Sequence, residues 1–350
     1  MKTIHFLFSS ITFFQLYIPI LLEARKRNIQ SIFYIRKNKK DYANVFSKEN
    51  KEIFDNFVEQ YNIQVESIDN LKSIKGLLFV VDGDIYGPPE VFKKNSFIIN
   101  YKFRFKDKVK IISLCEHLNF IWSYHEYINY VDYVIFSSKS QARLYKCLTK
   151  KNMYLGNTKY DNILSVEDIY IKKRLPSNQK YFLILYPKEK YVKLYNIKAE
   201  YIQKIYNYIH NLGYKIIVKS RPKDIVPESC KGDYYFSSDT YPNESLELMK
   251  IAYYCLLFSS SAIEETVMMG IPTIDFKVDT EIAKRLIYLY DDKVIKQIKK
   301  WKDIKLSGFK KNLDSLDVKN GPNFNRLKIN FLKKGNTSER ILDTFNNYII

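Results

Sequence analysis

Short apolar runs that end in turn residues recur along this chain, and they constrain its fold more than any other feature. Residues 76–84, GLLFVVDGD, form one such run, and residues 108–114, KVKIISL, form another. A short, continuously apolar segment closed by turn residues is typical of a strand buried in a parallel sheet. The same pattern predicts strands at residues 3–8, 31–36, 131–138, 180–187, 214–222, 252–258 and 272–276.

Helical patterns separate these strands, so the chain is predicted to have a doubly wound α/β fold. Its 350 residues are more than one hydrophobic core usually supports. The strand pattern starts again after LGNTKYDNI, which favours two Rossmann-like domains. We place an N-terminal domain at residues 1–158, a second domain at residues 159–335 and a terminal helix within residues 336–350.

The chain is strongly basic, with 57 Lys and Arg against 38 Asp and Glu and a formal net charge of +19. Such a charge indicates anionic partners: nucleotide phosphates, an anionic membrane surface or nucleic acid. Basic runs at residues 100–110 and 293–305 fit a solvated face or membrane docking, and no nucleic-acid module accompanies them. However, Lys, Asn, Ile and Tyr are common throughout and Gly is scarce, which is typical of an AT-rich genome. Low-GC bacteria and large DNA viruses have such genomes. The high net charge is therefore weaker evidence for an anionic partner than its value suggests.

The N-terminus contains an apolar stretch compatible with a signal peptide or an anchor. Ser9, Ser10 and Thr12 interrupt it, and it ends in EARKRN without a small-residue cleavage site. A strand, a serine loop and an amphipathic helix explain it better. The four cysteines form no Cys-x-x-Cys pair, which suggests neither a zinc site nor a disulfide framework. We expect a cytoplasmic protein, with a peripheral position at an anionic membrane as a further option.

The segment SSSAIEETVMMGIPTIDF, at residues 259–276, joins a predicted strand to a predicted helix. Ser261 and Glu264 have the spacing of a capping box, which requires no ligand. That box leaves Ser259, Ser260 and Glu265 unexplained. They follow the carboxyl end of a parallel strand, where oxyanions bind well at the start of a helix. Hydroxyls and backbone N–H groups suit a diphosphate, and a carboxylate one turn later suits a ribose diol.

This segment resembles the nucleotide-binding helix of GT-B enzymes, especially the CDP-glycerol polyolphosphotransferases, capsule-type glycosyltransferases and UDP-GlcNAc 2-epimerase-like proteins. The spacing from Glu265 to Gly270 and Pro272 matches the E-x4-[GN]-x-P of that group. The resemblance implies that Ser260 and Ser261 contact the diphosphate and that Glu265 holds the ribose. It also implies two Rossmann-like domains that face a cleft.

Other segments agree in order with the same group. LGNTKYDNI resembles the G-N-x-x-x-D that joins the two domains, and GNTSERILDTF resembles the closing helix that crosses back to the first domain. LILYPKEKY resembles the first strand and loop of the nucleotide domain. IIVKSRPKD resembles a K-x-H-P segment in which arginine replaces the usual histidine. The resemblance therefore implies an interdomain hinge and a set of phosphate-binding cations: Gly156, Asn157 and Asp161 for the hinge, and Lys188, Lys190, Lys219 and Arg221 for the phosphates.

In the first half, IISLCEHLNF resembles the turn that carries a His-Gly in polyolphosphotransferase-like members, with leucine in place of the glycine. His117 is the candidate general base, because histidine titrates near neutral pH, and Glu116 is the fallback. An equally good interpretation is that His117 is a structural residue whose hydrogen bonds are satisfied at the end of a strand. The loop after the first strand faces the acceptor in GT-B enzymes, although loop polarity alone also explains its residues: Ser9, Ser10 and Thr12.

Together these features predict a metal-independent glycosyltransferase that moves a sugar from a nucleotide-sugar donor to a glycan or lipid-linked acceptor in surface polysaccharide or glycoconjugate synthesis. Cations and a helix terminus would neutralise the leaving diphosphate, so no metal and no cofactor are expected. The Asp-Gly-Asp at residues 82–84 is interpreted as a turn. The alternatives are a CDP-polyol phosphotransferase, a UDP-sugar 2-epimerase-like enzyme, a non-catalytic protein of the same fold and, last, a nucleic-acid-binding protein.

Overall fold

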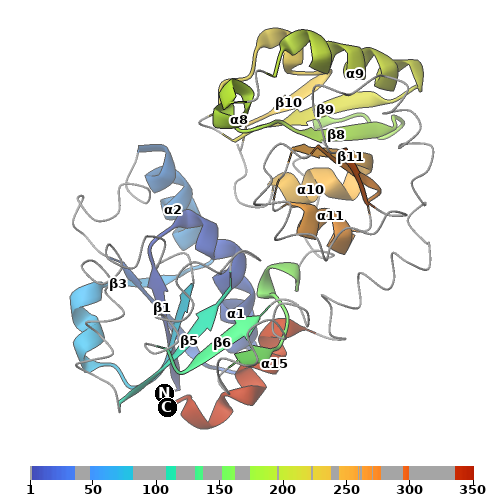
Figure 1. Cartoon of the computed structure of the whole chain (residues 1–350). Coiled ribbons are helices and arrows are strands. Elements are labelled where there is room, and N and C mark those ends of the chain that lie inside the picture. Colours follow the sequence, from blue (N-terminus) through green and yellow to red (C-terminus); the bar gives the residue numbers. More distant parts are fainter. Residues whose placement is uncertain are drawn as a thin grey trace. The chain divides into compact units, whose positions relative to one another are not determined.

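The chain forms two compact units, each with its own parallel sheet (Figure 1). Unit 1 consists of Met1–Leu164 and Phe331–Ile350, and unit 2 consists of Ser165–Asn330. The computed structural model describes residues 2–35, 48–81, 108–115, 131–136, 152–161, 174–194, 197–221, 224–237, 244–258, 260, 262–269, 271–276, 295–298 and 336–350.

Unit 1 has a seven-stranded sheet in the order β3-β2-β1-β4-β5-β6-β7, with all described neighbours parallel. Its strands are β1 (Thr3–Phe8), β2 (Gln30–Ile35), β3 (Gln64–Ser67), β4 (Gly76–Val81), β5 (Val109–Leu114), β6 (Tyr133–Phe136) and β7 (Asn152–Tyr154). Its helices are α1 (Phe14–Lys26), α2 (Lys48–Gln60) and α15 (Thr337–Thr344), with short 3-10 turns η1 (Ile11–Phe13), η2 (Ile68–Ser73), η4 (Thr158–Tyr160) and η8 (Asn346–Tyr348).

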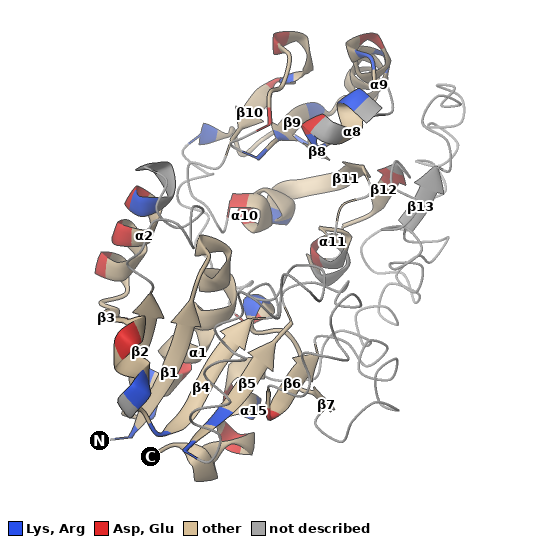
Figure 2. Ribbon diagram, turned by 60° about the vertical axis from the view of Figure 1, so that its left-hand side comes forward, with Lys and Arg blue, Asp and Glu red and all other residues tan. Residues whose placement is uncertain are grey.

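The core of unit 1 is aromatic. Strands β1, β2 and β4 contain no Lys, Arg, Asp or Glu, and the charges of this unit lie mainly on its helices and turns (Figure 2). Phe6 on β1 stacks on Phe33 of β2 at 4.7 Å and on Phe79 of β4 at 5.3 Å. Tyr17 of α1 donates a hydrogen bond of 2.9 Å to the carbonyl of Leu7. Helix α1 is therefore fixed to the central strands by both packing and a buried hydrogen bond.

Unit 2 has a six-stranded sheet in the order β10-β9-β8-β11-β12-β13, again with all described neighbours parallel. Its strands are β8 (Tyr181–Leu185), β9 (Lys215–Lys219), β10 (Tyr234–Phe236), β11 (Ala252–Phe258), β12 (Thr273–Phe276) and β13 (Ile295–Ile298). Its helices are α8 (Glu189–Leu194), α9 (Ala199–Asn211), α10 (Glu244–Ile251) and α11 (Ile263–Met269), with the 3-10 turn η5 (Glu228–Cys230).

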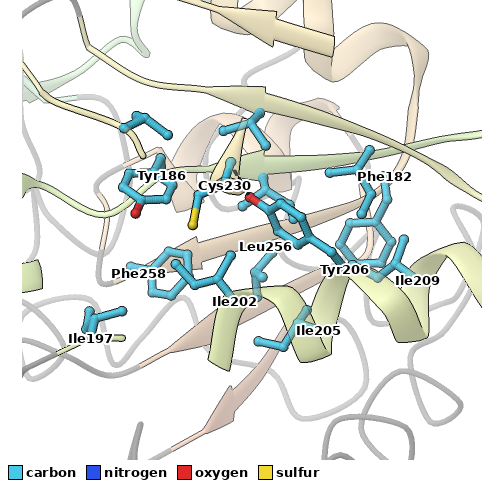
Figure 3. Close-up of a cluster of buried hydrophobic side chains, with 14 of the residues drawn as sticks. Phe182, Tyr186, Ile197, Ile202, Ile205, Tyr206, Ile209, Cys230, Leu256 and Phe258 are labelled. Carbon is cyan, nitrogen blue, oxygen red and sulfur yellow. Dashed lines mark hydrogen bonds between the residues drawn. The ribbon is translucent and has the colours of Figure 1, made fainter. Parts of the chain in front are cut away.

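One face of the unit 2 sheet is covered by α9, whose apolar residues recur at helical spacing (Figure 3). Ile202, Ile205 and Ile209 are buried against this face. Tyr206 lies among them, and its hydroxyl donates to the carbonyl of Cys230 at 2.7 Å. Burial raises the pKa of Tyr206, so this hydroxyl is a neutral structural donor.

In both units, the first strand in chain order lies inside the sheet, and later strands are added on each side of it. In unit 1, β1 lies between β2 and β4, and in unit 2, β8 lies between β9 and β11. Ligands of doubly wound sheets bind at such switch points, outside the carboxyl ends of the strands. The predicted fold class, two Rossmann-like doubly wound units, is thereby confirmed. The four strands at the sheet edges, β3, β7, β10 and β13, were not predicted from the sequence.

Candidate functional site

The switch point of unit 2 lies between the carboxyl ends of β8 and β11 and brings several predicted ligand residues to one edge of the sheet. Lys188 follows β8 after two residues and begins the turn into α8. Its carbonyl accepts hydrogen bonds from Tyr191 and Val192 at 2.8 and 3.1 Å, and its Nζ lies 5.8 Å from the Tyr191 ring centroid. Pro187, two residues after the end of β8, has no backbone N–H with which to extend the strand pairing. Lys190 lies in α8, but its side chain is outside the described residues.

At the end of β11, Ser260 makes the contacts that begin α11. Its Oγ accepts a hydrogen bond of 3.2 Å from the Ala262 N–H, and its carbonyl accepts one of 3.2 Å from Ile263. The described capping contact therefore belongs to Ser260, one residue before the serine that the capping-box prediction chose. Ser261 and Ser259 lie outside the described residues. Ser260 is half-buried beside the switch point.

Glu265 is half-buried in the first turn of α11. Its carboxylate lies close enough to the sheet to influence Cys255 of β11. Burial raises the pKa of the Cys255 thiol well above its usual value, and the charges of Glu265 and Asp275 raise it further. Asp275 on β12 is fully buried. Glu265 thus sits between a buried polar part of the sheet and solvent, where a carboxylate is held in place while one side remains accessible.

At the end of β9, Lys219 is part of the interior of unit 2. Its side chain is 7% exposed and its Nζ lies 3.0 Å from Oε2 of Glu244, a carboxylate of α10 that is 1% exposed. The same Nζ donates to the carbonyl of Ser220. The sequence suggested Lys219 as a phosphate contact, and it held no signal for this pairing, because Glu244 lies 25 residues further along the chain.

Arg221 follows Lys219 by two residues and has a different environment. Its Nε and Nη2 lie 2.8 and 3.4 Å from the two oxygens of Asp224, and 42% of its side chain is exposed. Asp224 also accepts a hydrogen bond of 3.3 Å from the backbone N–H of Glu189. Asp224 was not singled out from the sequence, although its position three residues after Arg221 is a recognisable pairing signal.

The predicted acceptor-side loop of unit 1 lies at the end of β1, beside the switch point of that unit. The Oγ of Ser10 accepts from the Thr12 N–H at 3.4 Å and lies 2.9 Å from the Thr12 Oγ1. Ser10 is therefore the N-cap of η1, which continues into α1. Ser9 is half-buried next to it. Structural capping explains two of the three hydroxyls, and an acceptor role for this loop stays a prediction.

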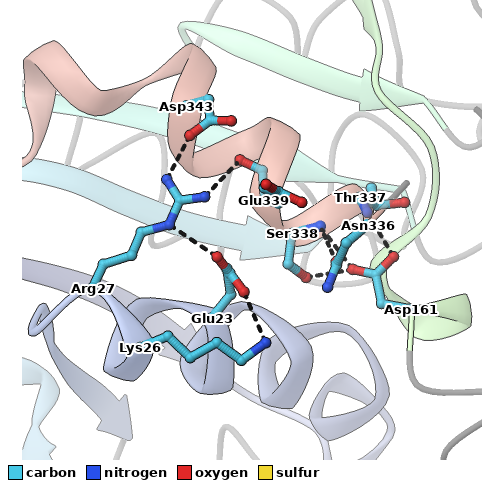
Figure 4. A network of polar contacts seen from close by, with 9 residues as sticks. All are labelled: Glu23, Lys26, Arg27, Asp161, Asn336, Thr337, Ser338, Glu339 and Asp343. Atoms are coloured by element: carbon cyan, nitrogen blue, oxygen red, sulfur yellow. Dashed lines mark hydrogen bonds and ion pairs between the residues drawn. The ribbon is translucent and has the colours of Figure 1, made fainter. Parts of the chain in front are cut away.

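Asp161, one of the predicted hinge residues, holds the terminal helix on unit 1 (Figure 4). The two oxygens of Asp161 accept 2.7 Å hydrogen bonds from the N–H groups of Thr337 and Ser338, and the Ser338 hydroxyl donates to the same carboxylate at 2.5 Å. Burial raises the pKa of Asp161, and these hydrogen bonds oppose the rise. Asn157 is the N-cap of η4, with its Oδ1 3.1 Å from the Lys159 N–H.

Further contacts complete this arrangement, which we call the α15 clamp: Asp161, Gly156, Arg340, Arg27 and Asp343. Arg340 donates to the carbonyl of Leu155 from Nε and Nη2 at 3.0 and 2.8 Å. Arg27 of α1 lies 2.6 Å from Asp343 and 3.0 Å from Glu23. These described contacts all lie within unit 1, so they fix α15 to α1 and η4. Whether the segment also acts as a hinge is untested.

The remaining predicted positions are outside the described residues. They are His117, Glu116 and the Asp-Gly-Asp at residues 82–84. Among the residues that the structure describes, no cluster of three or more His, Cys, Asp or Glu is arranged to hold a metal ion. Within the same ranges, no helix has both the length and the apolar character needed to cross a membrane.

Comparison with known proteins identifies the fold. No family model and no curated protein matches the sequence. Among solved structures, UDP-GlcNAc 2-epimerase from Methanocaldococcus jannaschii aligns with a TM-score of 0.65 and 15% identity, over 99% of this chain and 100% of that one. UDP-GlcNAc 2-epimerase from Neisseria meningitidis, bound to UDP-GlcNAc, gives 0.60 and 14%, over 99% and 100%.

The Wall Teichoic Acid Polymerase TagF aligns with a TM-score of 0.64 and 14% identity, over 99% of this chain and 88% of that one. A further TagF structure is that of a variant soaked with CDPG. The fold that these likenesses define is thus the GT-B fold of paired Rossmann-like units, as the sequence motifs predicted. At these identities the likeness establishes the fold alone.

Proposed function

We propose that this protein is a GT-B enzyme that uses a nucleotide-activated sugar as donor and transfers the sugar to a glycan or lipid-linked acceptor. One observation carries the proposal. At the switch point of unit 2, the ends of β8, β9 and β11 place Lys188, Arg221, Ser260 and Glu265 along one edge of the sheet. Cations, a hydroxyl and a carboxylate at such an edge match the groups of a nucleoside diphosphate.

The chemistry of the donor gives each group a role. A departing nucleoside diphosphate carries negative charge that develops in the transition state, and preorganised cations stabilise it. Lys188 and Arg221 are suited to that task. Glu265 would accept hydrogen bonds from a ribose diol. This division requires no metal ion and no cofactor, in line with the motif-based expectation.

The solved structures of the same fold support a nucleotide ligand. The two epimerase structures compared above carry the name UDP-GlcNAc 2-epimerase, one of them bound to UDP-GlcNAc, and one TagF structure is of a variant soaked with CDPG. A 2-epimerase activity is therefore the second candidate, and a CDP-polyol phosphotransferase is the third. The proposal includes three further points: the glycan or lipid-linked acceptor, a role in surface polysaccharide or glycoconjugate synthesis, and a peripheral contact with an anionic membrane.

Nucleotide binding is the first test. Thermal unfolding in the presence of millimolar UDP, CDP, CMP and GDP should show stabilisation by at least one nucleotide, because a ligand that binds only the native state raises its stability. A nucleotide at about 100 times its Kd adds about 2.7 kcal/mol. Unchanged unfolding with all four would remove the basis of the donor site.

The ribose assignment has a matched control in the neighbouring glutamate. Glu265→Gln should weaken nucleotide binding about tenfold, since a charge-assisted hydrogen bond contributes about 1.5–3 kcal/mol. Glu264→Gln, which the sequence assigns to helix capping, should retain the wild-type affinity. Equal affinities in the two variants would contradict the role of Glu265.

The reaction type is separated by the need for an acceptor. An epimerase acts on UDP-GlcNAc alone, whereas a transferase releases UDP in quantity only when an acceptor is added. Product analysis by NMR with and without glycan acceptors distinguishes the two. In a transferase, His117→Ala should lose turnover and keep nucleotide affinity, and full turnover would exclude this histidine as the base.

A further inference from the structure

The carboxyl end of β9 carries two cations with different environments, and the difference separates their functions. Lys219 is 6% exposed, and its Nζ lies 3.0 Å from the buried Oε2 of Glu244. A buried ammonium that is paired with a buried carboxylate is neutralised within the fold, and its removal alone leaves an uncompensated charge. Glu244 and the Ser220 carbonyl take up two of the three N–H donors of this ammonium, and its burial limits the access of a ligand phosphate to it.

Arg221 keeps its charge at the surface. The contact with Asp224 engages Nε and Nη2 at 2.8 and 3.4 Å, which fixes the plane of the guanidinium. A guanidinium carries five N–H donors in a planar fork, so a contact through Nε and Nη2 does not use the edge formed by Nη1 and the second N–H of Nη2. With 42% of its side chain exposed, Arg221 can meet a phosphate with that edge.

Asp224 connects this arginine to the neighbouring loop. Its Oδ1 accepts a 3.3 Å hydrogen bond from the N–H of Glu189, the residue directly after Lys188. Its side chain is 7% exposed, so little solvent competes for these contacts. One carboxylate thereby links Arg221, after β9, to the first residue of α8, next to Lys188.

We propose that Asp224 is a positioning residue that orients Arg221 as the diphosphate-contacting cation of β9, while Lys219 serves the core through Glu244. The inference rests on the proposed nucleotide-binding function of unit 2 and deepens it. From the segment IIVKSRPKD alone, both Lys219 and Arg221 were expected to bind phosphate; the inference assigns that role to Arg221. It also adds two residues, Asp224 and Glu244, that hold the cations without touching the ligand.

The first experiment measures UDP and CDP affinity by calorimetry in full-length variants. Arg221→Ala should weaken binding about tenfold or more. The double variant Lys219→Met/Glu244→Leu should bind within about threefold of wild type, because removing both charges together leaves no buried charge without a partner. The matched control is Lys215→Ala, which removes a cation at the opposite end of the same strand, where it pairs with Asp233 at 3.2 Å. It should bind as wild type does.

A mutant cycle tests the positioning role. Asp224→Asn should weaken nucleotide binding about threefold to tenfold in the wild-type background and cause no further loss when Arg221 is already alanine. A merely structural role would give the same loss in both backgrounds. Hydrogen exchange at the Glu189 amide should rise in Asp224→Ala whichever residue stands at position 221, and it should stay near wild type in Asp224→Asn, because the asparagine Oδ1 still accepts that hydrogen bond.

The outcomes separate this inference from the function on which it rests. If wild type binds UDP or CDP and the Lys219/Glu244 double variant loses affinity as Arg221→Ala does, the division of roles is overturned and the nucleotide site survives. The polar pair Lys219→Gln/Glu244→Gln replaces the double variant if the latter does not fold. If wild type binds neither nucleotide nor inorganic pyrophosphate, both the function and the inference fail.

Discussion

His5 is a buried histidine whose charged form the native state disfavours. It is 6% exposed on β1, and its Nδ1 lies 3.2 Å from the Tyr34 hydroxyl. Desolvation lowers the pKa of His5 to about 4, although a backbone hydrogen bond at Lys75 and the charge of Glu66 act in the opposite direction. Burial also raises the pKa of Tyr34 to about 12, so both partners are neutral near pH 7.

This histidine predicts a pH dependence of stability. A group with a lowered pKa in the native state contributes stability above its unfolded pKa of about 6.5, and that stability is lost as the pH falls toward 4. The loss reaches at most about 1.4 kcal/mol per pH unit. Urea unfolding between pH 7 and 4.5 should show a steeper decline for wild type than for His5→Gln. Parallel profiles for wild type and His5→Gln would refute the assignment.

Gly156 gives a second prediction at this scale. Its φ of +113° lies in the region that favours glycine, and an added Cβ would lie 2.7 Å from the Thr337 Oγ1. Gly156→Ala should therefore cost about 1–3 kcal/mol and loosen α15, seen as faster amide exchange at Thr337 and Ser338. Gly213→Ala has a similar φ of +82° with nothing within 4 Å of the Cβ. It should leave exchange of α15 unchanged.

At the residue scale, sequence reasoning located positions better than roles. Arg221, Ser260 and Glu265 all lie at the predicted edge of unit 2, because a strand end is visible in the local pattern. The partner of Lys219 could not be predicted, because Glu244 lies in α10, 25 residues further along the chain, and only the folded unit brings the two side chains together. Long-range ion pairs leave no local signal.

At the scale of elements, the α15 clamp explains why the C-terminal helix belongs to unit 1. Asp161 satisfies N–H groups of the first turn of α15, which have no partner within the helix. Thr3 donates to the carbonyl of Ile350 at 2.9 Å, so the end of the chain also binds the start of β1. The helix is held at both of its ends.

Removing the carboxylate should release the first of these ends. Asp161→Ala leaves the Thr337 N–H and the Ser338 hydroxyl without this acceptor, whereas the Ser338 N–H keeps the Oδ1 of Asn336 at 3.0 Å. The expected cost is about 1–3 kcal/mol. Amide exchange in α15 should accelerate, while exchange in α9 of unit 2 remains as in wild type. Asp343→Ala is the control, since it removes a contact to Arg27 that is 62% exposed on the aspartate side. A larger effect of Asp343→Ala than of Asp161→Ala would contradict the leading role of Asp161 in holding α15.

Central strands were predictable from sequence and edge strands were not. β4, GLLFVV, is buried at every position, so its apolar run is continuous. β3, QVES, has no fully buried residue, and β10 has three residues of which one is buried. A strand at the edge of a sheet has fewer neighbours to exclude water, so its sequence need not be apolar. The same physics explains why β7 and β13 were missed.

At the scale of the whole molecule, one topology occurs twice and its switch points have different surroundings. In unit 1, the residues described directly after β1 are neutral: Ser10 is the N-cap of η1, and its hydroxyl contacts that of Thr12. In unit 2, the corresponding edge holds Lys188 and Arg221 together with Glu265. Among the residues that the structure describes, charge therefore distinguishes this edge of unit 2 from the end of β1 in unit 1, although the two sheets share one topology.

This asymmetry predicts where a nucleotide acts on the full chain. In the presence of saturating UDP or CDP, hydrogen exchange should slow in peptides that contain Lys188, Arg221 and Glu265, since these lie at the switch point of unit 2. Peptides from the opposite edge of that sheet, around Lys215, should exchange as in the unbound protein, and α15 should serve as the reference in unit 1. Slowing centred on Ser9–Thr12 instead would assign the nucleotide to unit 1 and reverse the two sides. Slowing spread evenly over both units would indicate non-specific stabilisation of a basic protein by an anion, which added salt would abolish.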